Sequence, residues 1–221
     1  MLITIGPVME FPEFILALEK RLQQPLPGLT AQLRMTSMAR LRRLRNGGVP
    51  DDARPSSVLV LLYPYRSDIG FPVIRRPDYP GVHGGQVSLP GGKAEESDES
   101  LVYTALREAQ EEIGIDPGQV HVIGQLTELY IPPSNFLVTP VVGFLPCRPD
   151  FQADPEEVVE IMELTLSELT DPATKKRSRI RLPIGLTLRV PSYNNGGPVI
   201  WGATAMMLSE LEQIIREIRV S

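Results

Sequence analysis

An amphipathic segment, residues 98–113, is the feature that most constrains the fold of this chain. At about 100° per residue, its apolar positions fall within a stripe about 100° wide: Val102, Ala105, Leu106, Ala109 and Ile113. Ser97 or Asp98 can cap the start of such a helix, and Gly114 stands where helices commonly end in a left-handed residue. The segment therefore predicts a helix that buries one face.

Three glutamates form a second stripe that borders the buried one. Glu108, Glu111 and Glu112 fall at about 240°, 180° and 280° when Val102 is set at zero. Like charges at this spacing repel, and the positions four residues after each glutamate are Glu, Ile and Asp rather than Lys or Arg. Hard oxygen ligands at i, i+3 and i+4 suit Mg²⁺ or Mn²⁺, which also bind water and phosphate oxygens. The helix by itself leaves a plain acidic, solvated face open as an alternative.

The stretch LPGG, residues 89–92, comes shortly before this helix. Gly91 and Gly92 predict a turn in which the backbone can approach a ligand closely. The N–H groups of such a turn can bind a phosphate. A glycine turn that is followed by Arg107 and the three glutamates is a constellation, and it favours a cation and phosphate site over an acidic surface.

The composition is that of a globular protein and excludes several classes of function. The chain has 221 residues, 42% of them hydrophobic and 22% charged, which suits one large domain or one domain with an extension. A net charge of −5 argues against broad nucleic-acid binding. The one cysteine, Cys147, excludes an internal disulfide and a cysteine-built zinc site. Because neither a bilayer-spanning apolar stretch nor a basic signal-peptide start is found, we expect a cytoplasmic protein without membrane contact.

Apolar runs with the length of strands surround the acidic helix. The run 57–65 is continuous and β-branched, which is typical of a buried central strand. Further strand-like runs cover 70–77, 121–131, 136–146, 179–190 and 198–202. Residues 191–197 carry Asn and Gly and suit a hairpin turn. An amphipathic helix follows at 202–218, and Trp201 is assigned to the core. These elements predict an α/β or α+β domain with a mixed sheet.

Residues 1–50 are expected to form a helical extension in front of a main domain at 51–221. Residues 11–24 carry apolar side chains at helical spacing, and the stretch PLPGLTAQ then breaks the pattern. The N-terminal helix is a candidate contact for a homodimer.

Residues 92–114 resemble the Nudix box, which consists of a glycine, a spaced glutamate and the pattern Arg-Glu-apolar-any-Glu-Glu-any-Gly. Here Gly92 precedes the run REAQEEIG at 107–114. The distance from Gly92 to Arg107 is one residue longer than in the general box, so either Asp98 or Glu99 can fill the first acidic position. The resemblance implies a Nudix-type α/β/α sandwich around a mixed β-sheet.

The coenzyme A pyrophosphatase branch of the Nudix hydrolases has a similarly lengthened box and a second motif upstream of it. The stretch IRRPDYPGVHGGQVSLPGG, residues 74–92, is similar to that motif at Arg76, His83, Gly85, Gln86, Val87, Pro90, Gly91 and Gly92. Leu89 replaces an aromatic residue, and Gly81 stands where the branch usually has a second arginine. Resemblance to the family extends over about residues 55–218.

This resemblance implies hydrolysis of the pyrophosphate bond of coenzyme A or acyl-coenzyme A, giving 3′,5′-ADP and (acyl-)4′-phosphopantetheine. Glu108, Glu111 and Glu112 would bind Mg²⁺ or Mn²⁺. The implied catalytic group is Glu111, Glu108 and Arg107, with Arg107 orienting the glutamates. The implied substrate contacts are Arg75, Arg76, His83, Gln86, Gly91 and Gly92. The base that takes the proton of the attacking water stays open, as one of the glutamates or an acid elsewhere.

Two other functions are considered. The first is hydrolysis of another nucleoside diphosphate derivative, such as ADP-ribose or NADH, which Gly81 favours. The second is a Nudix-fold binding module without catalysis, and the complete Arg-Glu-Glu-Glu set speaks against it.

Overall fold

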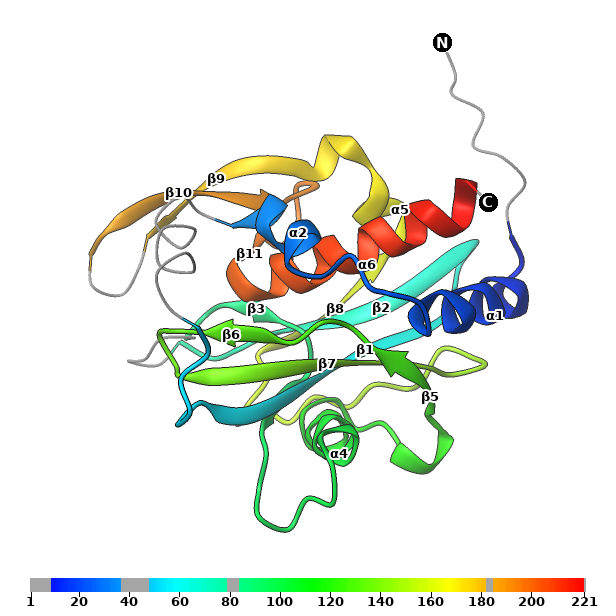
Figure 1. Cartoon of the computed structure of the whole chain (residues 1–221), viewed down its shortest axis with the longest axis horizontal. Coiled ribbons are helices and arrows are strands. Elements are labelled where there is room, and N and C mark those ends of the chain that lie inside the picture. Colours follow the sequence, from blue (N-terminus) through cyan, green and yellow to red (C-terminus); the bar gives the residue numbers. More distant parts are fainter. Residues whose placement is uncertain (1–8, 37–47, 79–83, 182–184, 221) are drawn as a thin grey trace.

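A mixed β-sheet lies between two helices that cover its opposite faces, α4 (Leu101–Ile113) and α6 (Gly202–Val220). The computed structural model describes residues 9–36, 48–78, 84–181 and 185–220. Figure 1 shows α4 below the sheet and α6 above it. The arrangement confirms the expected α/β class, with helices on both faces of a mixed sheet.

The central strand of this sheet is β1 (Arg54–Tyr65), which runs parallel to β7 (Phe136–Phe144) and antiparallel to β2 (Asp68–Arg75). The order along the sheet is β3–β2–β1–β7–β5, and β4, β6 and β8 pair with β1, β7 and β2. The bounds of these other strands are β3 (Val87–Ser88), β4 (Gly91–Lys93), β5 (His121–Gln125), β6 (Leu129–Ile131) and β8 (Glu160–Thr165). The expectation of a buried strand over 57–65 is confirmed.

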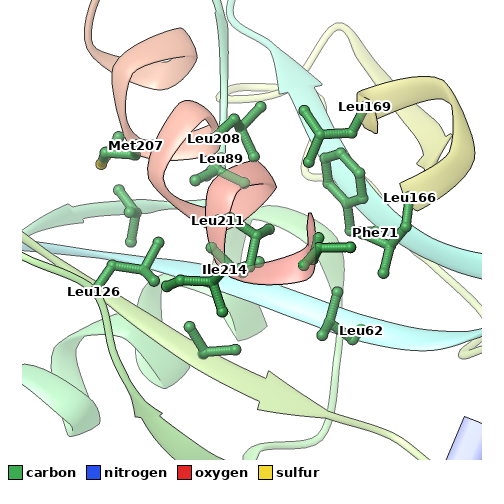
Figure 2. Packing of buried hydrophobic residues seen from close by; sticks show 14 of the residues in the cluster. Leu62, Phe71, Leu89, Leu126, Leu166, Leu169, Met207, Leu208, Leu211 and Ile214 are labelled. Carbon is green, nitrogen blue, oxygen red and sulfur yellow. The ribbon is translucent and has the colours of Figure 1, made fainter. Parts of the chain in front are cut away.

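Alternate side chains of β1 divide the core into two clusters. The cluster on the α4 face joins β1 to the apolar stripe of the helix: Leu59, Leu61, Tyr63, Ala105, Ala109 and Ile113. The intervening residues belong to the cluster on the α6 face: Val58, Val60, Leu62, Phe71, Leu208, Leu211 and Ile214. Figure 2 shows Leu208, Leu211 and Ile214 of α6 in one cluster with Leu62 and Phe71. The predicted buried face of the acidic helix is therefore confirmed.

A second, three-stranded sheet follows, built from β9 (Lys175–Arg181), β10 (Thr187–Tyr193) and β11 (Ile200–Trp201). The expected hairpin turn lies between β10 and β11. The expectation of one strand over 179–190 is wrong, because Arg181 pairs with Thr187 across an antiparallel hairpin. The run 121–131 likewise divides into β5 and β6, and a register shift interrupts β5 between Val122 and Gly124. Gly185 lies in the break of the first run, and Gly124 lies at the register shift inside β5.

The N-terminal helix α1 (Phe11–Leu22) contributes apolar side chains to the same cluster as α6. Two short helices follow, α2 (Gly28–Gln32) and η1 (Leu33–Met35). The buried carboxylate of Glu210 on α6 accepts hydrogen bonds from the Gly28 N–H at 2.9 Å and from Thr127 Oγ1 at 2.6 Å. Helices α1 and α2 therefore pack against the sandwich. The division of the chain into an extension at 1–50 and a main domain at 51–221 stays a prediction.

The other short helices are α5 (Leu166–Thr170), η2 (Pro117–Gln119) and η3 (Pro172–Thr174). Within the described part of the chain, no helix is long and apolar enough to span a bilayer.

Candidate active site

The glycine turn binds the carboxylate of Glu112. The Gly91 N–H donates to Glu112 Oε2 at 2.8 Å, and Arg76 Nη2 lies 2.8 Å from Glu112 Oε1. Arg76 Nη2 also donates to the Gly91 carbonyl oxygen at 2.8 Å. Because the Glu112 side chain is 0% exposed, this carboxylate is enclosed between the turn, the end of β2 and α4.

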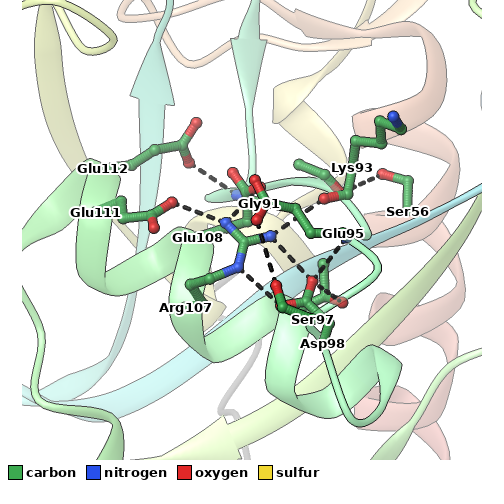
Figure 3. A network of polar contacts seen from close by, with 12 residues as sticks. Ser56, Gly91, Lys93, Glu95, Ser97, Asp98, Arg107, Glu108, Glu111 and Glu112 are labelled. Atoms are coloured by element: carbon green, nitrogen blue, oxygen red, sulfur yellow. Dashed lines mark hydrogen bonds and ion pairs between the residues drawn. The ribbon is translucent and has the colours of Figure 1, made fainter.

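The guanidinium of Arg107 lies among three carboxylates, as Figure 3 shows. Its Nε and Nη2 donate to the two oxygens of Asp98, each at 3.0 Å. Its Nη1 lies 3.0 Å from Glu108 Oε1 and 2.8 Å from Glu111 Oε2. A planar guanidinium with this many donors fixes several carboxylates at once. Arg107 therefore holds Glu108 and Glu111 in position.

Asp98, and not Glu99, is the acidic residue that pairs with Arg107. The Asp98 side chain is 1% exposed and also accepts hydrogen bonds from Thr104 Oγ1 at 2.8 Å and from the Glu95 N–H at 3.0 Å. Glu99 is exposed. The additional residue of this box therefore lies between Asp98 and Arg107, in the segment where Ser100 caps the start of α4.

Asparagine at position 98 should lower the free energy of unfolding by about 2 kcal/mol, because charge-assisted hydrogen bonds to a buried carboxylate are lost. Denaturant unfolding of Asp98→Asn measures this change. The matched control is Glu99→Gln, which removes a charge from the neighbouring exposed position and should stay within about 0.5 kcal/mol of the wild type. Equal losses in the two variants would contradict the pairing.

Burial raises the pKa of two glutamates on α4. Burial raises the pKa of Glu112 to about 7, although Arg76 and the Gly91 N–H favour its charged form. Burial also raises the pKa of Glu108, against the attraction of Arg107. The opposite shift is found at Asp98, whose pKa lies well below its usual range because of its hydrogen bonds with Arg107. Burial thus outweighs the nearby arginines at Glu108 and Glu112, whereas the hydrogen bonds of Arg107 outweigh burial at Asp98.

These shifts predict how stability depends on pH in metal-free protein. Because the folded-state pKa of Glu112 is raised, its favourable contribution is present below about pH 4.5 and is lost as pH rises toward about 7. Denaturant unfolding in EDTA, measured in steps from pH 5 to 8, should show a decline in wild type that is smaller in Glu112→Gln. Asp98 acts in a separate window, because its contribution is lost only as pH falls below about 4. Identical slopes in the two proteins would contradict the raised pKa.

The surroundings of Glu108 and Glu112 fit a divalent cation. A Cβ atom on Gly92 would lie 2.2 Å from Glu108 Oε2. Any other residue at position 92 would therefore displace the Glu108 carboxylate. In the described part of the chain no three acidic, histidine or cysteine side chains enclose a common point. Mg²⁺ needs no such cage, because it retains water and takes phosphate oxygens beside one or two carboxylates. A bound cation would favour the charged form of both glutamates against the burial that raises their pKa values.

A pocket of about 620 Å³ adjoins these groups, within the size range of small-molecule sites. Its lining includes Arg75, Gln86, Glu160, Arg181 and Trp201. Two residues that follow lining residues in the chain, Arg76 and Ser88, lie toward Glu112 instead. Arg76 Nε is 3.4 Å from Ser88 Oγ. Arg75 and Arg76 therefore serve different parts of the site, since successive side chains of a strand point to opposite faces.

The structure brings most of the residues predicted for the site together, in two adjoining groups. One surrounds the glutamates: Arg76, Gly91, Gly92, Arg107, Glu108, Glu111 and Glu112. The other lines the pocket: Arg75 and Gln86. Arg75 also forms an ion pair with Glu160 at 3.1 Å. His83, like Gly81, lies outside the described residues.

Sequence reasoning missed Arg181 and Glu160 and assigned Trp201 to the core, whereas Trp201 is half-buried and lines the pocket. No local motif marks these positions, because the second sheet and strand β8 bring them to the end of β2. The one local signal is at Arg181, which ends the run Arg-Ser-Arg-Ile-Arg at 177–181, where every second residue is an arginine.

The pattern of the glycine turn, Arg107 and the three glutamates is matched by a family model. The model described as the NUDIX domain matches residues 53–182. The chain belongs to the Nudix family. The matched range begins at β1 and ends after β9, so it contains the turn, α4 and Arg76. The predictions of a Nudix fold and of a Nudix hydrolase are confirmed.

Relatives of this Nudix hydrolase include proteins named Nudix hydrolase NudL. The one from Yersinia enterocolitica is 36% identical over 197 residues, which cover 87% of this chain and 88% of the relative. The one from Yersinia pestis is 40% identical over 140 residues, or 63% of this chain and 69% of the relative. Among solved structures, the Nudix hydrolase RenU from M. smegmatis is similar in fold, with a TM-score of 0.53, 18% identity and coverage of 75% of this chain and 88% of that one. The chain is thus a hydrolase of nucleoside diphosphate derivatives, and Nudix hydrolases generally use divalent cations.

Proposed function

We propose that this Nudix hydrolase cleaves the pyrophosphate bond of coenzyme A or acyl-coenzyme A, giving 3′,5′-ADP and (acyl-)4′-phosphopantetheine. The contact between Arg76, Gly91 and Glu112 carries the proposal. Arg76 and Gly91 belong to the stretch 74–92, which resembles the coenzyme A branch, and Glu112 belongs to the lengthened box. The two motifs therefore act as one site.

Glu108, Glu111 and Glu112 would bind Mg²⁺ or Mn²⁺, which when bound withdraws charge from a diphosphate and makes phosphorus easier to attack. Arg107 orients Glu108 and Glu111 through its ion pairs at 3.0 and 2.8 Å. Arg76 lies at the border of this group with 25% of its side chain exposed. It can therefore direct its remaining hydrogen-bonding capacity toward a phosphate oxygen.

The adjoining pocket suits the remainder of a large, phosphorylated substrate. Arg75 and Arg181 lie in its lining beside the acidic Asp78 and Glu160, and Trp201 adds an aromatic surface. Such a combination favours a ligand with phosphate groups and a ring system. Coenzyme A carries a third phosphate on its ribose in addition to its diphosphate, which fits a pocket with two arginines.

The test is hydrolysis of a panel of compounds in the presence of Mg²⁺ or Mn²⁺. The panel contains coenzyme A, acetyl-coenzyme A, NADH, ADP-ribose and nucleoside triphosphates, and ion-pair chromatography identifies the products. We expect 3′,5′-ADP to form from coenzyme A with the highest kcat/KM in the panel and no turnover in EDTA. Glu112→Gln protein, purified in parallel, controls for contaminating phosphatases.

Higher kcat/KM on NADH or ADP-ribose would overturn the coenzyme A assignment and favour the alternative that Gly81 suggests. Binding of these compounds without cleavage of any would favour a binding module.

A further inference from the structure

The pocket beside the glutamates lies between the two sheets of the molecule. The first sheet contributes Arg75 from β2 and Glu160 from β8, and the second sheet contributes Arg181 from β9 and Trp201 from β11. Arg76, the chain neighbour of Arg75, contacts the acidic helix instead. A substrate whose diphosphate lies at Arg76 and the glutamates can therefore extend along the pocket to the wall that the second sheet forms.

The two arginines of the lining differ in their partners. Arg75 donates from Nε and Nη2 to Glu160 Oε2, at 3.3 and 3.1 Å. Arg181 is exposed and forms no hydrogen bond or ion pair with any residue that the structure describes. The other carboxylate of the lining, Asp78, lies against Gly85, where a Cβ atom would be 2.2 Å from its Oδ1. Within the described lining, Arg181 is therefore the arginine whose donors are available to a ligand.

Arg181 is also the last of a row of arginines on one face of β9. Because successive side chains of a strand point to opposite faces, Arg177, Arg179 and Arg181 share a face. Arg189 of β10 lies directly opposite Arg179, and like charges in this position are destabilising. All four side chains are exposed. The face therefore favours an anion, and Arg181 is the member of the row that lines the pocket.

We propose that Arg181 determines specificity by binding a phosphate monoester of the substrate that is not part of its diphosphate, and this proposal rests on the proposed function. A planar guanidinium can form two parallel hydrogen bonds to one phosphate group. A phosphate monoester carries nearly two negative charges at neutral pH. In coenzyme A this group is the 3′-phosphate of the ribose, which NADH and ADP-ribose lack. Arg181 thus selects coenzyme A from among the nucleoside diphosphate derivatives.

The variant Arg181→Gln, assayed with coenzyme A and with 3′-dephospho-coenzyme A, tests this role. The two compounds share the diphosphate and differ only in the phosphate monoester. Wild-type kcat/KM should be about 10- to 100-fold higher for coenzyme A, the range expected for hydrogen bonds between charged groups. In Arg181→Gln the value for coenzyme A should fall to that for the dephosphorylated compound, which should itself stay within about threefold of the wild type.

The matched control is Arg179→Gln, which removes one arginine from the same face of β9 outside the pocket lining and should leave both values unchanged. Arg181→Lys retains the charge without the two-pronged donor and should keep an intermediate preference. Titration calorimetry gives a readout without turnover, because the wild type should bind 3′,5′-ADP more tightly than AMP and Arg181→Gln should bind the two equally. The thermal unfolding midpoints should match, since both arginines are exposed.

An equal loss on both compounds in Arg181→Gln, or no loss on either, would overturn the assignment. A wild type that cleaves both compounds with the same kcat/KM would overturn it while the proposed function stands. A wild type that cleaves neither compound would overturn the proposed function, and the role of Arg181 with it.

Discussion

Replacing Glu112 by glutamine should lower kcat/KM by a factor on the order of 10³, the scale on which removal of an electrostatic group acts. Glutamine has the shape of glutamate and can still accept the Gly91 N–H, but it cannot supply negative charge to a cation. The loss should therefore appear as weaker Mn²⁺ binding, which titration calorimetry measures without substrate. Steady-state hydrolysis of coenzyme A measures the kinetic loss.

The fold should survive this change. Arg76 retains its hydrogen bond to the Gly91 carbonyl oxygen at 2.8 Å, and burial of a neutral amide avoids the desolvation that raises the pKa of Glu112. Circular dichroism and the unfolding midpoint should match the wild type within a few degrees. Glu99→Gln is the control for loss of one acidic charge near α4. Undiminished turnover or Mn²⁺ binding in Glu112→Gln would reject the assignment of Glu112 to the cation site.

Replacing Gly91 by alanine should lower the free energy of unfolding by about 2–6 kcal/mol. Its φ of 148° lies in a region that is open essentially to glycine alone. A Cβ atom there would lie 2.3 Å from the Ser57 carbonyl oxygen and 2.5 Å from Val58 Cα. Strain costs about 1–3 kcal/mol and overpacking about 1–3 more, and backbone atoms of a central strand cannot move aside. Denaturant unfolding measures the sum.

The control variant Gly196→Ala measures the cost of backbone strain without a steric clash. Gly196 has a φ of 102°, and a Cβ atom there would meet nothing within 4 Å. Gly196→Ala should therefore cost only the backbone term, about 1–2 kcal/mol. If both variants lose the same amount, the close approach of β4 to β1 does not constrain position 91.

Most of the acidic helix could be predicted from the sequence because helical periodicity is local. The buried stripe with Ala105, Ala109 and Ile113 and the cap at Gly114 follow from residue spacing alone, whereas the burial of Glu112 does not. The strand over 57–65 is equally local, since its continuous apolar run suits burial on both faces. The split of 179–190 was not predicted, because the apolar pattern continues across the break.

The choice between Asp98 and Glu99 could not be made from spacing. Either residue satisfies the box, and only the loop before Ser100 decides which carboxylate reaches Arg107. Asp154 is a similar case, because it follows the end of α4 by about forty residues and its N–H donates to the Glu112 carbonyl oxygen. Contacts of this kind depend on the path of the chain and leave no periodic trace in the sequence.

The sequence by itself determined that a glycine turn is followed by a helix with a row of carboxylates, because both features depend on neighbours within a few residues. Tertiary structure alone decided that Arg76 pairs with Glu112 and that Asp98 pairs with Arg107, whereas the pairs of Arg107 with Glu108 and Glu111 lie within about one turn of α4. It also decided that the pocket with Arg75 and Arg181 adjoins them. The physical reason is that pairing energies depend on distance and burial, which only the packed sheet and helices define.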